Sequence, residues 1–254
     1  MSKDERHDHI LELIALQPDG LLVSELIECL DCSPATVRRD LISLEKVGLI
    51  VQSRGRVRKS ETRNASFDLR GVINGTEKEA IGKTAAALVK DGESIIIDSG
   101  TTTLALAYSL LARQRLFVVT NSIPVAYAFN GTAINTCMCG GTVNDMCLVD
   151  DDATTYLASR RVDKAFIGAC GVRADGLTIL SSFQHPVKRK MVEMADEVYV
   201  LVDSSKFESS GIIRFADFSD LTGLVTTKPI RNERILEEID KHNVNLIVAG
   251  EDIE

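Results

Sequence analysis

The chain has 254 residues, of which 44% are hydrophobic and 26% charged, and its formal net charge is −8. This length suits one large domain, or a small domain followed by a medium one, and the composition excludes a disordered chain. No apolar run reaches the roughly 20 residues of a membrane span, and the charged start MSKDERHDHI is unlike a signal peptide. Six cysteines without a regular spacing then predict reduced thiols in a cytoplasmic protein.

The basic residues are concentrated in one short stretch of this acidic chain. Residues 1–31 contain Lys3 and Arg6 against eight acids, whereas residues 32–63 contain eight lysines and arginines against three acids. A net charge of −8 disfavours a nucleic-acid partner for the chain as a whole, but it hides the uneven distribution of charge along the sequence. The local excess of positive charge predicts a surface that binds a polyanion.

The first sixty residues have the periodicity of three short helices. Apolar residues at helical spacing predict a helix over 3–17, and Val23-Ser24 opens a second, with Ser24 as its expected cap. Ser33-Pro34 starts a third helix, with serine at the cap and proline in the first turn. Gly48 is expected to end it in the left-handed conformation that glycine tolerates.

The second and third helices, joined by a tight turn, form the pattern of a helix-turn-helix. On the third helix Thr36, Arg38 and Arg39 fall on the open side near the N-terminal half, which is the part that enters a major groove. The following segments 49–52 and 56–59 predict a small hairpin, and hence a winged helix. The residues expected to bind DNA are Ser33, Thr36, Arg38, Arg39, Arg54 and Arg56, the last two through phosphates or the minor groove.

A polar, aperiodic segment over 60–76 predicts a linker between a DNA-binding domain at 1–59 and a larger domain at 77–254. In the larger domain, apolar strands alternate with helices, which predicts a mostly parallel sheet covered on both faces. Strands are expected at 93–98, 116–120, 134–139, 164–170, 198–203, 221–227 and 244–250. Helices are expected at 77–89, 103–112, 123–129, 185–196 and 235–243, with Lys78 and Lys83 of the first facing solvent.

Small polar residues and glycines follow several of these strands. Ligands of open parallel sheets bind beyond the carboxyl ends of the strands, so these positions predict one binding site. In DSGTTT, residues 98–103, glycine permits close approach and the threonines supply hydroxyls and amides at a helix start, which favours an anion. Lys206 adds positive charge from another loop. The expected ligand-binding residues are Asp98, Gly100, Thr101, Thr102, Thr103, Thr120, Asn121, Gly140, Gly141, Gly171 and Lys206.

Two parts of the sequence resemble one family of proteins. SPATVRRDLISLEKVGLI, residues 33–50, is similar to the helix-turn-helix signature of the DeoR family of bacterial transcription regulators. Further segments are similar to the sensor domain of the same family: DSGTTT (98–103), VVTNSIPVA (118–126), CGGTVN (139–144), DKAFIGACGV (163–172) and VLVDSSKF (200–207). The resemblance departs in the wing, at residues 52–57, and at Gln184, where many relatives carry an acid.

The resemblance implies a second domain similar in fold to ribose-5-phosphate isomerases and coenzyme A transferases. It also implies a repressor of a carbohydrate-utilisation operon that acts as a homodimer or homotetramer. A phosphorylated sugar would release it from operator DNA, with the phosphate near residues 100–103 and Lys206. No enzymatic activity, cofactor or metal is expected. The sugar itself stays open, because Gln184 and His185 alter the loop before a predicted helix.

Two alternatives remain beside this interpretation. The first is a sugar-phosphate isomerase with an appended DNA-binding domain, in which Asp98, Asp175, Asp203 and Lys206 would be the acid and base candidates. The second is a metal or redox sensor built on Cys137, Cys139 and Cys147. A Cys-x-Cys pair in a strand places both thiols on one face, but without Cys-x-x-Cys pairs or a histidine cluster it does not have the spacing of a zinc site.

Overall fold

The computed structural model divides into two units, Met1–Thr76 and Glu77–Glu254. It describes residues 3–15, 17, 20–30, 32–46, 50–53, 55–59, 67–207 and 211–250. None of the helices in these ranges is long and apolar enough to cross a membrane.

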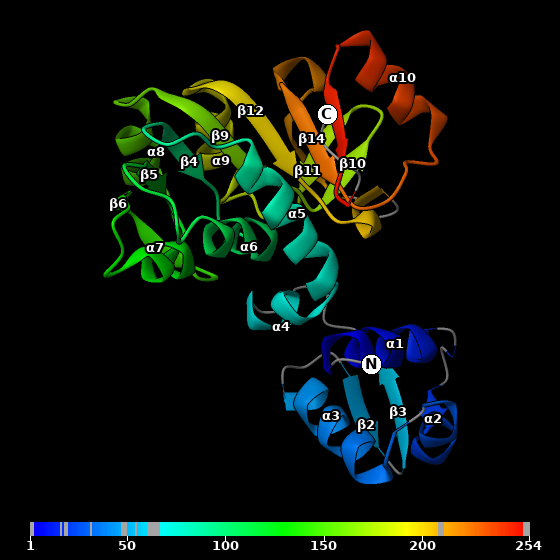
Figure 1. Ribbon diagram of the computed structural model, residues 1–254. Coiled ribbons are helices and arrows are strands. Elements are labelled where there is room, and N and C mark those ends of the chain that lie inside the picture. Colours follow the sequence, from blue (N-terminus) through cyan, green and yellow to red (C-terminus); the bar gives the residue numbers. More distant parts are fainter. Residues whose placement is uncertain are drawn as a thin grey trace. The chain divides into compact units, whose positions relative to one another are not determined.

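The first unit is built from short helices and a small antiparallel sheet (Figure 1). Its elements are α1 (Lys3–Ala15), β1 (Leu21–Leu22), α2 (Val23–Cys29), α3 (Pro34–Lys46), β2 (Ile50–Ser53), β3 (Arg56–Lys59) and α4 (Phe67–Val72). The predicted hairpin is confirmed, with Ser53 opposite Arg56 across the turn. The short strand β1, which the sequence did not predict, pairs with β3 and makes the strand order β1-β3-β2.

One face of α3 packs into the core of this unit. Val37, Leu41 and Leu44 are fully buried against apolar residues of α1 and α2. The predicted cap of α3 is confirmed, because the Thr36 amide donates to Ser33 Oγ at 3.2 Å. Gly48 lies outside the described residues.

The predicted cap of α2 is wrong. The helix begins at Val23, so Ser24 lies within its first turn, and Leu22 is the residue before it. The Leu22 amide donates to Glu25 Oε2 at 3.0 Å, so an acidic side chain in the first turn satisfies a free amide at this end.

The predicted linker contains helical structure. Helix α4 and the start of α5 (Gly75–Ala87) both fall within residues 60–76, while residues 60–66 lie outside the described part of the chain. Asn74 joins the two helices in the left-handed region, with φ at 54°. Asparagine tolerates this conformation better than most residues, which is why so short a connection is possible.

The second unit alternates strands and helices, as the sequence predicts. Its helices are α5, α6 (Thr101–Ser109), α7 (Ile123–Phe129), α8 (Asp151–Ala158), α9 (His185–Glu193) and α10 (Glu233–Lys241), with the 3-10 turns η1 (Ser204–Phe207) and η2 (Phe218–Asp220). The strands of the main sheet are β4 (Ser94–Ile97), β5 (Phe117–Thr120), β6 (Asn135–Met138), β9 (Val162–Gly168), β12 (Ala195–Leu201), β14 (Gly223–Thr226) and β15 (Asn245–Val248).

The main sheet is entirely parallel, in the order β15-β14-β12-β9-β4-β5-β6. From β4 the chain proceeds outward to β5 and β6, then returns to the other side of β4 and proceeds outward again from β9. The sheet therefore reverses its direction of growth between β4 and β9. Such a switch point is where open parallel sheets bind their ligands, beyond the carboxyl ends of the strands.

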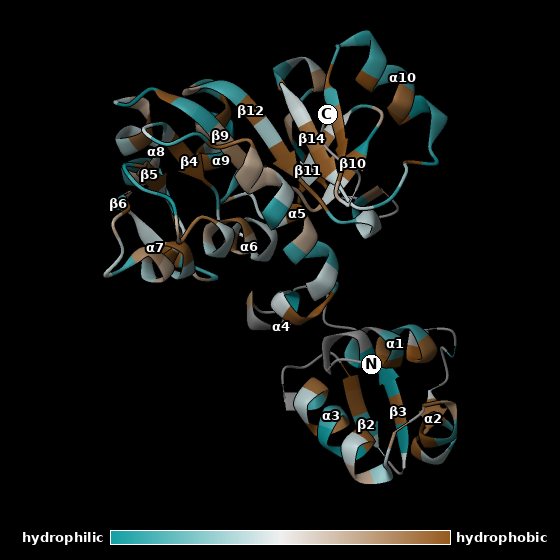
Figure 2. Cartoon of the chain, in the orientation of Figure 1, coloured by the Kyte–Doolittle hydropathy of each residue, from teal (hydrophilic) through white to brown (hydrophobic). Residues whose placement is uncertain are grey.

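Both faces of this sheet are buried, because adjacent strand residues enter different cores. Ile96 belongs to one cluster, with apolar residues of α8, α9 and α10, whereas Ile95 and Ile97 belong to another, with residues of α5, α6 and α7. Two layers of helices thus cover the sheet. In Figure 2, α10 shows hydrophobic and hydrophilic residues alternating along the helix, as expected for a helix with one buried face.

Several small elements were missed by the sequence analysis. They are α8, the hairpin of β7 (Thr142–Asn144) and β8 (Cys147–Val149), and the antiparallel strands β10 (Gly171–Arg173), β11 (Gly176–Ile179) and β13 (Ile213–Ala216). The strands have only three or four residues each, too few for a periodic pattern. The prediction that Lys78 faces solvent is wrong, because this residue is buried in α5. Lys83 of the same helix is exposed, as predicted.

Helices α5 and α6 approach each other at backbone distance. A Cβ atom built on Gly82 of α5 would lie 2.6 Å from the carbonyl carbon of Ala105 in α6. We therefore expect Gly82→Ala to lower the free energy of unfolding by about 1–3 kcal/mol, measured by urea denaturation, because overpacking displaces one helix from the other. Gly75→Ala is the control, since its Cβ meets no described atom within 4 Å and alanine favours the helix. Equal stability of the two variants would contradict this tight packing.

Candidate DNA interface and effector site

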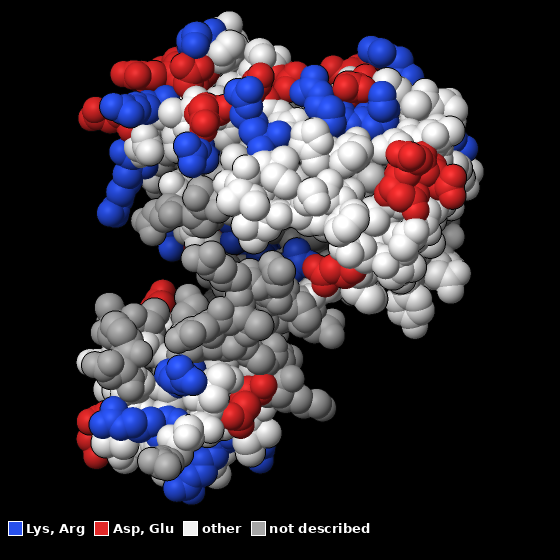
Figure 3. All heavy atoms as spheres, turned by 180° about the vertical axis from the view of Figure 1, so that it is seen from behind, with Lys and Arg blue, Asp and Glu red and all other residues white. Residues whose placement is uncertain are grey.

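The open face of α3 presents two unpaired arginines. Arg38 and Arg39 are exposed, and no acidic side chain in the described part of the chain forms an ion pair with either. Figure 3 shows several groups of lysine and arginine side chains on the surface of this unit. Guanidinium groups left free on a short helix can donate to guanine edges or to phosphates.

The first turn of α3 is held by its own cap. The hydroxyls of Ser33 and Thr36 lie 2.8 Å apart, and Ser33 Oγ also accepts from the Thr36 amide. Both residues were predicted to contact DNA, and both are already engaged in stabilising the helix start. A contact with DNA would have to use the remaining lone pairs of these hydroxyls.

A buried carboxylate attaches α3 to α1. Asp40, which is 2% exposed, accepts from Arg6 Nε at 2.5 Å and lies 3.2 Å from His7 Nε2. Burial raises the pKa of Asp40, but the hydrogen bonds from Arg6 and His7 outweigh it and lower the pKa below its ordinary value. Asp40 adjoins Arg39 in the chain, so this cluster fixes the rotation of the helix that carries the exposed arginines.

The wing is attached at its base. Arg56, at the start of β3, donates from Nη1 to the Gly20 carbonyl at 2.7 Å, which ties the hairpin to the segment before β1. Gly55 occupies the turn with φ at 76°, a conformation that glycine adopts without strain. Arg54, also predicted to contact DNA, lies outside the described residues.

In the second unit, a buried ion pair occupies the switch point of the sheet. Asp98 follows β4 and is 0% exposed, and its Oδ2 accepts from the Gly168 amide at the end of β9 at 3.0 Å. Lys188 of α9, 4% exposed, donates to the same oxygen and to the Gly168 carbonyl at 2.9 Å. Asp98 was predicted as a site residue, whereas Lys188 was taken as part of an ordinary helix and was missed.

Two buried acceptor atoms at this edge have no donor among the described residues. They are Asp98 Oδ1 and Asn121 Oδ1, and the two residues are 0% and 1% exposed. They follow neighbouring strands, since Ile97 of β4 is opposite Thr120 of β5. Buried acceptors normally find a donor, so this pair is suited to hydroxyl groups of a ligand.

The DSGTTT segment combines structural and free groups. Thr103 Oγ1 donates to the carbonyls of Asp98 at 2.7 Å and Gly100 at 3.0 Å, so this hydroxyl shapes the loop. Helix α6 starts at Thr101, and Gly100 before it has no side chain to cap the helix. The amides of Thr102 and Thr103 have no acceptor among the described residues, so they remain available at the positive end of the helix, where an anion binds well.

Gly100 is not required by the fold. Its backbone is extended, with φ at 164°, and a Cβ built on it would meet Thr103 Oγ1 at an ordinary 3.4 Å. The nearest atom to this Cβ belongs to Thr103 in the first turn of α6, so a side chain here would lie beside the helix start. The glycine is thus best explained by access to the helix start.

Other predicted ligand-binding residues have structural partners. Thr120 Oγ1 donates to the Ile97 carbonyl at 2.6 Å, and Asn121 Nδ2 donates to the Leu148 carbonyl at 3.3 Å. Gly141 has φ at 120°, and a Cβ there would lie 2.3 Å from the Val149 carbonyl oxygen, so the β7–β8 hairpin requires this glycine. Gly171 begins β10, where its carbonyl accepts from Thr178 Oγ1 at 3.1 Å.

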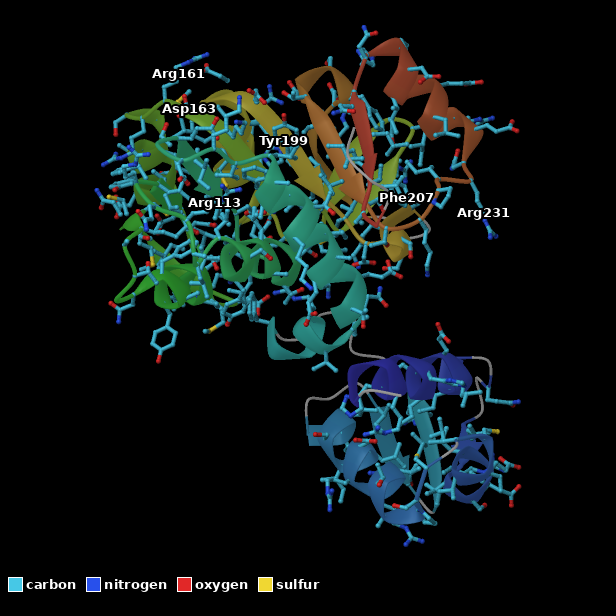
Figure 4. The ribbon with its side chains drawn as sticks, viewed as in Figure 1. Arg113, Arg161, Asp163, Tyr199, Phe207 and Arg231 are labelled. Carbon is cyan, nitrogen blue, oxygen red and sulfur yellow. The ribbon has the colours of Figure 1, made fainter. Side chains whose placement is uncertain are left out.

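Gly140 and Lys206 also lie beyond the carboxyl ends of strands, after β6 and β12. Lys206 is in η1, with Nζ 3.7 Å from Asp203 Oδ2 and 3.2 Å from Ser205 Oγ, and its side chain is 30% exposed. In Figure 4, Asp163 at the start of β9 and Phe207 in η1, which follows β12, lie at opposite ends of the parallel strands. The predicted ligand-binding residues all lie at the carboxyl ends of the strands, on the same side as Phe207.

The two buried cysteines, Cys139 and Cys147, have thiols with a raised pKa. Cys147 is fully buried, donates to the Asn144 carbonyl at 2.9 Å, and accepts from Gln184 Nε2 at 3.5 Å. Burial raises the pKa of Cys147, with Asp98 adding to the effect, and burial raises the pKa of Cys139 to about 11. Protonated thiols are weak metal ligands and nucleophiles. The described residues contain no group of three histidine, cysteine or acidic side chains placed to hold a metal ion.

The first unit is a winged helix with exposed arginines, and the second is a parallel α/β domain whose strand ends carry groups that suit an anion. Together they define a DNA-binding regulator with a sensor domain. The chain belongs to the DeoR family of transcription regulators. The DeoR-like helix-turn-helix domain matches residues 6–63, and the DeoR C terminal sensor domain matches residues 73–228. The resemblance and fold class inferred from the sequence are thus confirmed.

Several relatives align along most of the chain. The HTH-type transcriptional repressor GlcR of Bacillus subtilis (strain 168) is 31% identical over 257 residues, 99% of this chain and 98% of that protein. The glycerol-3-phosphate regulon repressor of Haemophilus influenzae is 31% identical, over 89% of this chain and 90% of that one. The lactose phosphotransferase system repressor of Lactococcus lactis is 33% identical, over 82% and 84%.

Solved structures give weaker likenesses. Ribose 5-phosphate isomerase A of Methanocaldococcus jannaschii is 25% identical, with a TM-score of 0.40 over 53% of this chain and 55% of that one. The translation initiation factor eIF-2B of Pyrococcus horikoshii OT3 is 16% identical, with a TM-score of 0.46 over 87% and 86%. Both scores are below 0.5, so neither likeness bears on function. The predicted likeness to coenzyme A transferases stays a prediction.

The pair of Asp98 and Lys188 leads to a stability prediction. Lys188→Met leaves the Asp98 carboxylate buried without its cation, and we expect a loss of about 3–5 kcal/mol in the free energy of unfolding. The double variant Asp98→Asn/Lys188→Met removes both charges and is expected to recover most of that loss. Urea denaturation measures both values, and a single variant as stable as the parent would show that the pair is not buried in solution.

Proposed function

We propose that the protein is a repressor of genes for carbohydrate use and that a phosphorylated sugar or related polyol releases it from its operator. The observation that supports this most directly is the switch-point edge of the sheet. There, the amides of Thr102 and Thr103 suit a phosphate, and the oxygens of Asp98 and Asn121 that lack a donor among the described residues suit hydroxyl groups. The regulons named for the relatives, of glycerol 3-phosphate and of the lactose phosphotransferase system, agree with an effector of this class.

The proposal includes the absence of enzymatic turnover. An isomerase needs an acid or base beside its substrate. Among the candidates, Asp175 lies in an exposed turn and pairs with Arg173 at 2.8 Å. Asp98 is held by Lys188 inside the protein. These partners support a carboxylate that positions groups and binds a ligand, and the names of the relatives, which are repressors, support the same conclusion.

The oligomeric state belongs to the proposal as well. A single recognition helix reads one short half-site, and two copies bound to one face of DNA read two half-sites about 34 Å apart. We therefore propose that the protein binds its operator as a homodimer or homotetramer. An effector then acts by favouring an arrangement in which the two helices no longer match successive grooves.

The DNA interface predicts the effect of arginine substitutions. Arg38→Ala and Arg39→Ala are each expected to weaken binding to an operator fragment about 5- to 150-fold, since a good arginine–base contact contributes about 1–3 kcal/mol. Fluorescence anisotropy with DNA from the region upstream of the protein's own operon measures this. Where the lost contact is to a phosphate, the slope of log K against log salt should also fall by about 0.9.

Arg161→Ala is the matched control for these substitutions. It removes an exposed arginine from the second unit, where Arg161 pairs with Asp196 at 2.5 Å. This variant should bind DNA as the parent does. If Arg38→Ala and Arg39→Ala do so too, α3 is not the recognition helix.

The effector site predicts thermal stabilisation by phosphorylated compounds. In a panel of glycerol 3-phosphate, glucose 6-phosphate, fructose 1-phosphate and ribose 5-phosphate, at least one compound should stabilise the protein, by about 2.7 kcal/mol at a hundredfold excess over Kd. Gly100→Ala should retain the melting temperature, since its Cβ meets only Thr103 Oγ1 at an ordinary 3.4 Å, but it should lose most of this shift, because a methyl group beside the helix start hinders an anion bound there. Gly75→Ala should keep it. Stabilisation by unphosphorylated sugars alone would contradict the phosphate site.

A further inference from the structure

Glu77, the first residue of the second unit, has a carboxylate that receives four hydrogen bonds from described residues. Its Oε2 accepts from the Ser204 amide at 3.0 Å and from Thr227 Oγ1 at 2.5 Å. Its Oε1 accepts from Ser204 Oγ at 3.1 Å and from Lys228 Nζ at 3.0 Å. These donors follow two strands of the main sheet, β12 and β14, so one side chain near the start of α5 spans two strand ends.

Glu77 is held in its ionised form. Burial alone would raise the pKa of Glu77, but the hydrogen bonds from Thr227, Ser204 and Lys228 outweigh burial and lower the pKa to about 2. Charge-assisted hydrogen bonds of this kind are roughly twice as strong as neutral ones. The attachment of α5 to the strand ends therefore persists throughout the neutral pH range.

Ser204 belongs to the same 3-10 turn as Lys206. This turn, η1, has only four residues, so Lys206 and the Ser204 groups bonded to Glu77 are parts of the same short turn. In the proposed function Lys206 supplies positive charge to the effector. A displacement of η1 towards an anion would thus change the bonds that Glu77 receives.

Helix α5 also contacts the other half of the proposed phosphate site. Gly82 lies against the backbone of Ala105 in α6, and the first turn of α6 carries the amides of Thr102 and Thr103, which have no acceptor among the described residues. One helix therefore touches both elements that would hold the anion. Glu77 meets η1 near the start of α5, and Gly82, five residues further along, meets α6 about one and a half turns later.

Helix α5 is also the covalent continuation of the DNA-binding unit. That unit ends at Thr76, and α5 begins one residue earlier, at Gly75. Only Ile73 and Asn74 separate α5 from α4. Any change in the first turn of α5 thus acts on the chain that leads to the winged helix.

We propose that Glu77 is a positioning residue that couples the effector site to the DNA-binding unit, by transmitting movement of η1 to the first turn of α5. This inference rests on the proposed function and adds its route of regulation. An effector changes DNA affinity only through a difference in its own affinity for the two arrangements of the protein. The bonds from Ser204 to Glu77 provide such a difference, since they join the loop that meets the anion to the helix that leads to DNA.

Hydrogen exchange on the full-length protein tests this coupling, with inorganic phosphate as the first probe and glycerol 3-phosphate as the second, at matched ionic strength. In the parent, the probe should alter the exchange of amides at 101–103, in η1 and in the first turn of α5. In Glu77→Gln it should still alter the amides at 101–103, while the first turn of α5 no longer responds. Ser204→Ala, which removes one of the four bonds, should give an intermediate response.

Glu79→Gln is the matched control, because Glu79 is an exposed glutamate on the same helix and should respond like the parent. DNA binding supplies the functional readout. Effectors typically change affinity about 5- to 150-fold, and Glu77→Gln should reduce the effect of glycerol 3-phosphate on operator affinity to less than about twofold. The amides at 101–103 should still report that the probe is bound.

The outcomes separate the two proposals. If the first turn of α5 responds in Glu77→Gln as it does in the parent, or fails to respond in the parent although residues 101–103 do, the coupling through Glu77 is wrong and the effector site stands. If neither probe alters residues 101–103 in the parent, the anion site itself is wrong. The coupling is then overturned with it.

Discussion

The buried pair of Asp98 and Lys188 is the interaction on which the sensor domain depends. It lies at the only place where the main parallel sheet, as described, reverses its direction of growth, and it joins β4, β9 and α9 through one carboxylate oxygen. A buried charge requires a partner, so these elements must assemble together. The same arrangement leaves the other oxygen of Asp98 unpaired, which makes a structural centre into a place where a ligand can bind.

The two units use charge in opposite ways. In the winged helix, Arg6 forms an ion pair with Asp40 inside the domain and His7 lies 3.2 Å from the same carboxylate, while Arg38 and Arg39 are exposed and pair with no acidic side chain that the structure describes. In the sensor domain, the lysine at the switch point is buried, and the amides of Thr102 and Thr103 have no acceptor among the described residues. The first arrangement suits a long polyanion that approaches an exposed surface, and the second suits a small anion at the carboxyl ends of the strands.

Helix α5 gives the protein a physical route between these functions. Its contacts with η1 and α6 are a carboxylate that accepts hydrogen bonds from Ser204 and a close backbone approach, both of which transmit displacement better than mobile surface side chains would. The segment that the sequence suggested was a plain linker is partly helical, and it leads directly into this helix.

The sequence by itself determined the local structure: the helices and parallel strands of the core, the cap at Ser33 and the loop at residues 98–103, because each depends on neighbouring residues. Tertiary structure alone decided which groups are free. Thr103 and Thr120 look like ligand-binding hydroxyls, yet they bond to backbone carbonyls. Lys188 reaches Asp98 from 90 residues away, and Ser204 reaches Glu77 from 127. Such pairings follow from strand order, which no local periodicity encodes.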